Sequence, residues 1–217
     1  MMETPEPQDM DAAAADYRRA IQLAPAHAPS YEGLAGLIHG LPIFQATDIE
    51  LLQRGLLLEP GNAMIEAGIA AAEIRSGRAP EGLDRLRAIV GRNAGRNHAG
   101  VQFARRVLAG ELLKADLAEI ERLADRREFK EAIAVIDRAL ERNLELPHRQ
   151  MFAATRRSLV DYQSITAAVE LAHRGDFSGS RAMLEKLLAS RPDHGATAEA
   201  QRLLREIERQ EKGHAKD

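Results

Sequence analysis

The side chains that could bind metal ions or transfer protons are spread along the chain without the spacing that such chemistry needs. Two histidines three or four residues apart on one helix can share a metal ion, and none of the seven histidines has such a partner. Glu66, Glu73 and Asp84 could act as acid–base pairs, but no spacing separates them from the solvated carboxylates of ordinary helices. The sequence therefore predicts no catalytic residue and no metal site.

One basic, glycine-rich stretch, residues 91–97, could bind an anion beside the start of a helix. It lacks the Lys-Ser/Thr pair that ends a phosphate-binding loop, and the chain contains no nucleophile motif and no dinucleotide-binding fingerprint. We interpret residues 91–100 as a turn between two helices. We therefore expect a protein that is not an enzyme and that needs no cofactor.

The composition favours closely packed helices and does not point to nucleic acid. Of the 217 residues, 45% are hydrophobic and 29% charged, as in a globular chain, while aromatic residues make up only 4% and Trp is absent. The core must therefore be built from Ala, Leu, Ile and Val, of which Ala has the highest helix propensity. The net charge of −3 lacks the basic excess of nucleic-acid-binding proteins.

The sequence also gives expectations about location. It contains no Cys, so disulfides are excluded. Residues 1–11 are acidic and hold two prolines without an apolar run, unlike a secretory signal, although a trimmed export signal would leave no trace. No apolar stretch approaches about 18 residues, so we expect no membrane span and no membrane partner. We expect a soluble, cytoplasmic protein.

Hydrophobic periodicity and turn residues predict ten helices after a disordered lead over residues 1–10. In the second half the helices are longer. One is expected over residues 101–126, and its single glycine, Gly110, is where a bend could occur. Phe152 and Tyr162 fall on one apolar ladder, which favours core packing over a binding stripe. The expected helices cover residues 11–23, 29–39, 48–58, 63–75, 80–90, 101–126, 129–142, 148–173, 178–190 and 196–210.

Five segments share one spacing. Each begins at a residue i that is usually small, continues with residues at i+4 and i+7 that are usually apolar, and has a further apolar residue or a helix stop at i+12. A pattern that recurs every 34 to 50 residues or so is typical of helical repeats, which stack because one hairpin cannot bury its apolar face alone. Residues 123–129 also match residues 171–177 at an offset of 48, and residues 74–79 form a similar turn. The five segments are Ala13/Tyr17/Ala20/Pro25, Asp48/Leu52/Gly55/Pro60, Gly82/Leu86/Ile89/Ala94, Ala132/Ile136/Ala139/Leu144 and Ser180/Leu184/Leu187/Pro192.

These motifs resemble the tetratricopeptide-repeat (TPR) family. The likeness is carried by Ala13-x3-Tyr17-x2-Ala20-Ile21-x3-Pro25 and Tyr31-x2-Leu34-Ala35-x2-Ile38, and by Leu52-x2-Gly55-x4-Pro60 with Ile69-Ala70 before Gly77. It is clearest over residues 11–94, where the Pro25–Pro60 and Pro60–Ala94 intervals are 35 and 34 residues, and weaker over 95–217. The resemblance implies an all-α, right-handed α-solenoid of antiparallel helix hairpins, with repeats over 11–96 that continue as long-helix repeats and a capping helix over 97–212.

The sequence departs from the family pattern at Asp48 and Gly82, which replace the usual alanine. In the family, ligands lie in a concave groove lined by the first helix of each hairpin. Family members that grip chaperone C-terminal carboxylates use Lys and Asn there, and this chain has no Lys before Lys114, so that ligand class is not expected. By resemblance, the groove candidates are Glu32, Gly36, His39, Met64, Ala67, Ala71 and Arg75.

The function that this predicts is a scaffold or adaptor that binds a peptide segment or partner protein in the groove, with specificity from charged groups such as Glu32 and Arg75. Three alternatives stay open. The chain could be an accessory subunit or fragment of a larger enzyme or of a secretion or assembly complex. It could be a helical enzyme with an unrecognised site. It could also self-associate through the long helices of its second half.

Overall fold

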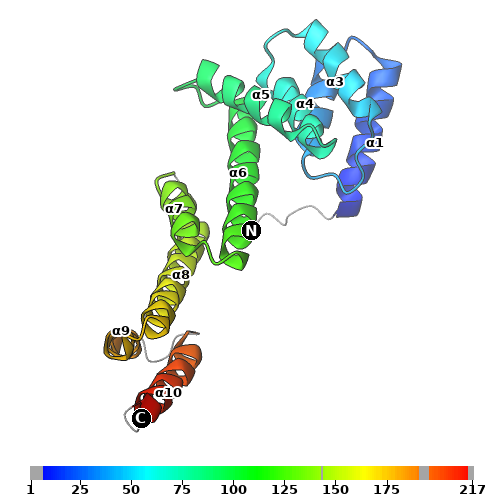
Figure 1. Cartoon of the computed structure of the whole chain (residues 1–217). Coiled ribbons are helices and arrows are strands. Elements are labelled where there is room, and N and C mark those ends of the chain that lie inside the picture. Colours follow the sequence, from blue (N-terminus) through cyan, green and yellow to red (C-terminus); the bar gives the residue numbers. More distant parts are fainter. Residues whose placement is uncertain (1–6, 143, 191–195, 215–217) are drawn as a thin grey trace. The chain divides into compact units, whose positions relative to one another are not determined.

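The structure of the protein is a computed structural model that describes residues 7–142, 144–190 and 196–214. In this part of the chain all regular structure is α-helical, with ten helices and no strand (Figure 1). All ten predicted helices are present, and their ends lie within four residues of those expected. The helices are α1 (Pro7–Leu23), α2 (Ala28–Ile38), α3 (Thr47–Leu58), α4 (Ala63–Arg75), α5 (Ala79–Arg92), α6 (Ala99–Asp125), α7 (Phe129–Leu140), α8 (Leu146–His173), α9 (Phe177–Ser190) and α10 (Thr197–His214).

Some boundaries differ from the prediction. Residues 7–10, expected in a disordered lead, form the first turn of α1, and the rest of that lead lies outside the described residues. The turn expected over 91–100 is shorter, because α5 extends through Arg92 and α6 begins at Ala99. Helix α6 continues as one helix through Gly110.

Proline and asparagine residues mark where helices begin. Pro29, Pro80 and Pro147 lie in the first turns of α2, α5 and α8, where a backbone N–H has no partner within the helix to lose. Asn62 caps α4, since its side-chain oxygen accepts a hydrogen bond from the backbone N–H of Met64 at 3.0 Å. Local sequence therefore sets the starts of these helices without help from tertiary packing.

Three hairpins turn through one residue in the left-handed conformation. These residues are Gly77, Arg127 and Gly175, with φ of 83°, 60° and 84°. In each turn the backbone N–H of this left-handed residue donates to the carbonyl oxygen three residues before it. The N–H of the following residue donates to the carbonyl oxygen five residues before that residue, and all these hydrogen bonds are 2.9–3.1 Å long. Glycine adopts this φ without strain, whereas Arg127 does so at a cost.

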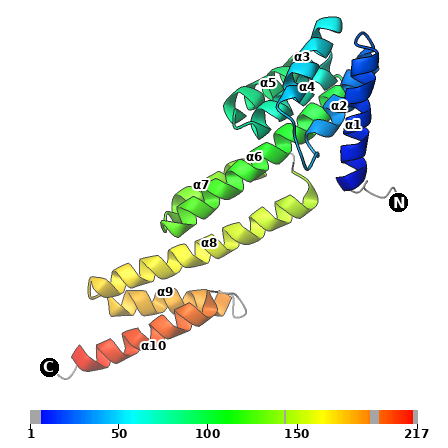
Figure 2. The same ribbon diagram turned by 90° about the vertical axis from the view of Figure 1, so that its right-hand side faces the viewer.

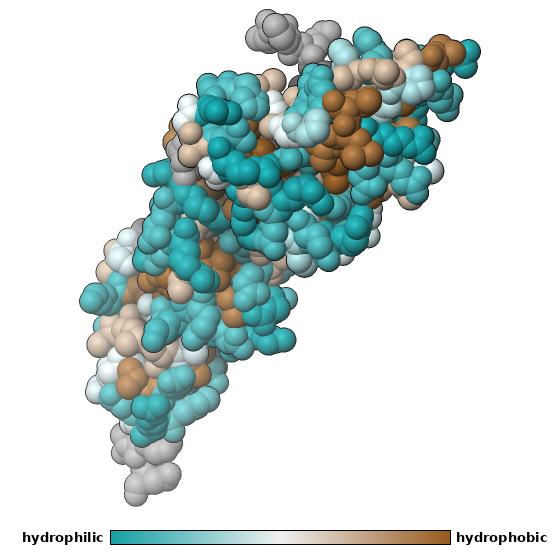
Figure 3. Space-filling view, turned by 90° about the horizontal axis from the view of Figure 1, so that it is seen from above, coloured by the Kyte–Doolittle hydropathy of each residue, from teal (hydrophilic) through white to brown (hydrophobic). Residues whose placement is uncertain are grey.

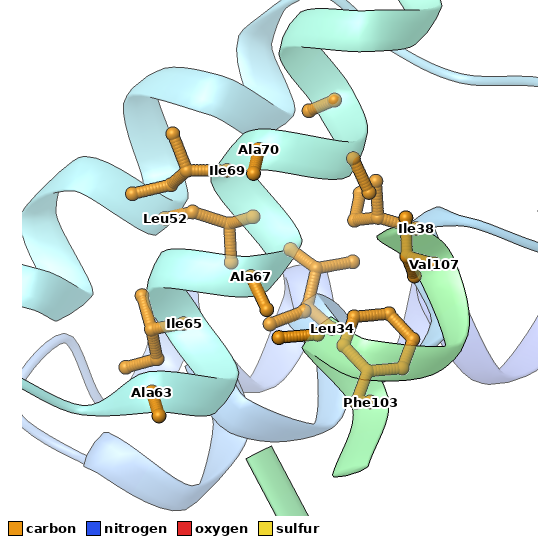
Figure 4. Packing of buried hydrophobic residues seen from close by; sticks show 14 of the residues in the cluster. Leu34, Ile38, Leu52, Ala63, Ile65, Ala67, Ile69, Ala70, Phe103 and Val107 are labelled. Carbon is orange, nitrogen blue, oxygen red and sulfur yellow. The ribbon is translucent and has the colours of Figure 1, made fainter. Parts of the chain in front are cut away.

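Residues Met1–Leu112 form the first compact unit. Its centre is α4, which packs against α2, α3 and α5, and the N-terminal half of α6 joins the same core. Figure 4 shows Leu34 and Ile38 of α2, Leu52 of α3 and Phe103 of α6 around α4. Because α4 is enclosed on several sides, nine of its thirteen residues are buried.

Small residues let the helices of the first unit approach closely. A Cβ placed on Gly68 of α4 would lie 2.5 Å from the Cβ of Ala35 in α2. One placed on Gly82 of α5 would lie 2.5 Å from the carbonyl oxygen of Ala70 in α4. Gly82, a departure from the family pattern, therefore occupies a contact that is too close even for alanine.

Two buried carboxylates in this unit are held by bidentate arginines. Asp48 is fully buried, and both its oxygens accept hydrogen bonds from Arg18 of α1 at 2.8 Å. Glu73, 4% exposed, accepts two hydrogen bonds from Arg85 at 2.9 and 3.0 Å. The hydrogen bond from Arg18 to Asp48 raises the pKa of the arginine. A charged Asp48 is tolerated at a normally small position because Arg18 compensates its burial.

Residues Leu113–Asp217 form the second compact unit, which has two apolar clusters. In one, the C-terminal half of α6 and the N-terminal half of α8 enclose α7, with Phe152 fully buried. In the other, α8, α9 and α10 pack together around Leu184 and Ala168 (Figure 2). The Ser180 hydroxyl of α9 donates to the carbonyl of Ala168 at 2.6 Å and links α9 to α8.

The division between the units lies inside α6, whereas the sequence predicted a change of repeat type at residues 96–97. Val101 and Phe103, early in α6, belong to the first core. Ile120 and Leu123, late in the same helix, belong to the second. The two apolar ends of one long helix therefore serve different cores, which a turn-based boundary cannot reveal.

Candidate functional site

Three of the predicted groove residues lie near one another at the surface of the first unit. Glu32 accepts a hydrogen bond from the Asn62 side-chain amide, and it lines a cavity of about 340 Å³ together with Met64 and His98. A Cβ on Gly36 would lie 3.8 Å from the sulfur of Met64. Glu32 and Met64 therefore share one small cavity, and Gly36 lies beside it.

The other predicted groove residues have different surroundings. Ala67 and Ala71, which the resemblance placed in the groove, are 0% and 1% exposed because the helices packed around α4 cover them. The Arg75 guanidinium donates a hydrogen bond to the carbonyl oxygen of Ile38 at 2.7 Å and lies over the ring of Phe44. Both contacts hold this guanidinium within the fold of the first unit. His39 is exposed just beyond the end of α2.

The corresponding face of the second unit is open. Gly77 and Gly175 occupy equivalent turns, so residues at equal distances before them are equivalent. By this count Tyr162, Ile165 and Val169 of α8 correspond to the groove candidates Met64, Ala67 and Ala71 of α4. The α8 residues line a cavity of about 510 Å³. We call it the α8–α10 cavity, and its lining is Ala124, Asp125, Arg127, Phe129, Leu159, Tyr162, Ile165, Thr166, Val169, Glu199, Arg202 and Leu203.

Side-chain size accounts for this opening. Gly68 of α4 nearly touches Ala35 of α2, and its equivalent in α8 is Thr166. Thr166 and Val169 carry branched side chains where α4 has only glycine and alanine. Branched side chains at these positions hold neighbouring backbones apart, so a hollow forms between α8, α10 and the turn before α7.

An aromatic pair lies on the wall of the cavity. The rings of Phe129 and Tyr162 are 6.1 Å apart and inclined by 24° in a stacked arrangement. Phe152 is fully buried, which confirms its predicted role in the core, but Tyr162 is 36% exposed. The prediction of core packing is therefore wrong for Tyr162, because that part of α8 faces the cavity. Exposed aromatic rings beside apolar walls are typical of binding surfaces.

The rim of the cavity carries four charged side chains. Each of its two walls contributes one acidic and one basic residue. Asp125 and Arg127 lie at the end of α6 and in the turn after it, and Glu199 and Arg202 lie on α10. Within the described part of the chain, none of the four forms an ion pair. Their charges are therefore available to a ligand.

No protein-family model matches the chain, and no curated protein sequence matches it significantly. Among the residues that the structure describes, no three His, Asp or Glu side chains gather as a metal ion would require. Nor is any described helix both long and apolar enough to cross a membrane. Candidate sites must therefore be ranked on geometry.

A larger cavity of about 710 Å³ lies between α8 and α9. Its walls mix polar side chains such as Ser164 and Lys186 with the apolar side chains of Val160, Met183 and Leu187, and no aromatic ring lines it. The smaller α8–α10 cavity is the stronger candidate because it alone of the two carries aromatic rings, which contribute most to binding at interfaces.

Exposed leucines and isoleucines form a weaker candidate. Figure 3 shows hydrophobic side chains in several separate places on a face that is mostly polar, with one larger patch among them. The most exposed large apolar residues in the described ranges are Leu57, Leu23, Ile43 and Leu146, at 82%, 75%, 71% and 67%. None of them lines the α8–α10 cavity, and single exposed apolar side chains are normal on protein surfaces.

The sequence contained a signal for the residues that the prediction missed. The turns at residues 74–79 and 171–177 are visibly similar, and aligning their glycines carries Met64 onto Tyr162. Counting along α8 from that match would have placed Tyr162 and Val169 in the groove. The rim residues Glu199 and Arg202 could not be found this way, because they depend on where α10 packs.

Proposed function

We propose that this protein is a protein–protein interaction scaffold or adaptor that binds a segment of a partner in the α8–α10 cavity. The proposal includes the finer fold, in which TPR-like antiparallel hairpins stack as a right-handed solenoid. The single observation that carries it is the half-exposed Tyr162, stacked on Phe129 in an open cavity at the repeat position where the family binds its ligands.

Energetics support an occupant for this cavity. An exposed aromatic ring beside Val169 and Leu203 leaves apolar area in water, and covering it would contribute about 25 cal/mol for each Å² buried. The volume of about 510 Å³ lies within the range of roughly 300–1,000 Å³ typical of ligand pockets. Aromatic residues in such pockets dominate binding energy at protein interfaces.

The alternatives from the sequence stay open as roles for the same fold. An accessory subunit of an enzyme or assembly complex would use the cavity for one stoichiometric partner, and a self-associating chain would bring a second copy. An enzyme would use the rim carboxylates of Asp125 and Glu199 or the Tyr162 hydroxyl to transfer protons. A cytoplasmic location rests on the sequence alone.

Affinity capture from an extract of the source cells tests the proposal, with the full-length chain as bait. Tyr162→Ala and Val169→Lys remove the ring and place a charge in the cavity, and Leu146→Ala changes an exposed leucine elsewhere. We expect wild type and Leu146→Ala to retain the same partner and both cavity variants to lose it, with all four chains melting at similar temperatures. Retention of every partner by both cavity variants would refute the site.

A further inference from the structure

Resting on the proposed function, we infer that the α8–α10 cavity recognises a partner segment in which one aromatic side chain is flanked by an acidic and a basic residue. The apolar wall selects the aromatic side chain, and the mixed rim selects the flanking charges. This occupant differs from an all-acidic peptide, which two of the four rim groups would repel.

The apolar half of the inference follows from the shape and lining of the cavity. Phe129 and Tyr162 present stacked rings on one side, and Val169 and Leu203 contribute branched aliphatic side chains. A third aromatic ring gains from such walls, because aromatic groups favour offset or edge-to-face contact with other rings. An aromatic residue also loses little conformational entropy on binding, since it has few rotatable bonds.

The charged half follows from the rim. The turn after α6 offers Asp125 and Arg127, and α10 offers Glu199 and Arg202, so each wall presents one carboxylate and one guanidinium. A segment that crosses the cavity between these walls meets both signs of charge. One acidic and one basic flanking residue can each be paired, whereas two flanking residues of one sign leave two rim groups facing a like charge.

The backbone of Arg127 adds a further argument. At the equivalent positions Gly77 and Gly175 the same turn is made without strain, and Arg127 makes it at φ 60°. Strained residues persist where the surrounding structure holds them, and they cluster at binding and switch regions. Here the strained residue is also a rim residue of the cavity, which is the place where a guanidinium would serve a ligand.

Defined synthetic peptides test the inference with the full-length chain. Each fluorescently labelled nonapeptide has a central Phe within a Ser/Gly frame, flanked by Asp and Lys in either order, by two Asp, by two Lys or by two Ser. Fluorescence polarisation should give the tightest binding for one Asp/Lys order, about fivefold tighter than for the two-Asp or two-Lys peptide. Because most of the rim charges are exposed, salt screens their ion pairs, so the advantage of the Asp/Lys peptide should shrink between 50 and roughly 300 mM salt.

Rim variants provide the matched control. Arg127→Glu with Arg202→Glu makes the rim acidic, and the preference should move to the two-Lys peptide. Asp125→Lys with Glu199→Lys makes the rim basic, and the preference should move to the two-Asp peptide. Tyr162→Ala should weaken all peptides about tenfold or more, with Tyr162→Phe retaining most binding and with thermal unfolding showing that each variant is folded.

The outcomes separate this inference from the proposed function. A wild-type preference for the two-Asp, two-Lys or two-Ser peptide, or a preference that rim variants leave unchanged, overturns the mixed-charge segment. Absence of peptide binding also overturns it, and if Tyr162→Ala still abolishes partner capture, the interaction scaffold stands with a different ligand. Loss of both peptide binding and cavity-dependent capture overturns the two proposals together.

Discussion

Helices α4 and α8 occupy equivalent places in their hairpins, yet one is enclosed and the other borders an open cavity. Ala67, Gly68 and Ala71 lie on one face of α4 and are all buried. At Gly68 the backbone of α2 approaches so closely that a Cβ would lie 2.7 Å from the Cα of Ala35. The equivalent residues of α8 are Ile165, Thr166 and Val169, and they line the α8–α10 cavity. Ile165 is 4% exposed and belongs to the core of its own unit, so the difference between the two faces rests on Thr166 and Val169, which are only partly buried.

The opposite faces of the same two helices differ in polarity. Ile65 and Ile69 of α4 are 0% and 1% exposed and belong to the core that includes α3. Their equivalents in α8, Gln163 and Ala167, line the 710 Å³ cavity beside α9. Gln163 is exposed and Ala167 is half-buried, so this face of α8 is less enclosed than the corresponding face of α4.

The largest expected effect comes from placing a charge in each core. Leu86 and Leu184 are equivalent residues, nine positions after their turn glycines, and they are 0% and 1% exposed. Leu184→Asp should destabilise the second unit by about 3–5 kcal/mol, because it buries an unpaired carboxylate, and Leu86→Asp should do the same to the first unit. Urea unfolding followed by hydrogen exchange would locate the loss, with exposed Leu146→Asp as the control. Unchanged stability in Leu184→Asp would mean that Leu184 is exposed.

Exchanging side-chain size between α4 and α8 tests the volume argument directly. Gly68→Thr should destabilise the first unit by about 2–3 kcal/mol, because a Cβ there already lies 2.5 Å from that of Ala35. The reverse change, Thr166→Gly, removes a side chain from a cavity wall and should cost only about 0.5 kcal/mol, because the helix propensity of glycine is only about 0.3 kcal/mol below that of threonine. Thermal unfolding measures both losses of stability. If Gly68→Thr and Thr166→Gly were equally destabilising, side-chain volume would not explain why the α4 face is enclosed and the α8 face is not.

A smaller effect is expected where α9 meets α8. The buried Ser180 hydroxyl donates to the carbonyl of Ala168 at 2.6 Å, and Gly82 makes the equivalent contact in the first unit without a hydrogen bond. Ser180→Ala should cost about 1 kcal/mol in chemical unfolding, the usual net worth of a hydrogen bond. Ser190→Ala serves as the control, since its hydroxyl also bonds to a backbone carbonyl but at an exposed site. A loss no larger than the control would show that the bond contributes nothing.

The sequence predicted the helices well because their starts and stops are local. Pro29, Pro80 and Asn62 set helix starts by their own chemistry, and Gly77 and Gly175 end helices because they reach positive φ. No partner from elsewhere in the chain is needed to read these signals, and the all-α class follows from them.

The candidate site was harder to predict because it depends on what covers each helix. Ala67 and Ala71 have the small size expected at a helix crossing, but only the position of neighbouring helices shows that they are fully enclosed. Tyr162 lies on the same apolar ladder as Phe152, but Phe152 packs into the cluster of α6 and α7, whereas Tyr162 borders the α8–α10 cavity. Periodicity identifies an apolar face without identifying its partner.

The smallest expected effect concerns the three equivalent turns and carries the opposite sign. Arg127→Gly should stabilise the second unit by about 0.5–1 kcal/mol, because relief of the left-handed strain exceeds the added freedom of glycine in the unfolded chain. Gly175→Arg, the matched reversal in the same unit, should destabilise by a similar amount. Thermal unfolding measures both changes. If Arg127→Gly stabilises the fold while weakening partner capture, the strain at the cavity rim is retained for binding. If it destabilises, the Arg127 side chain makes contacts that outweigh the strain of its backbone.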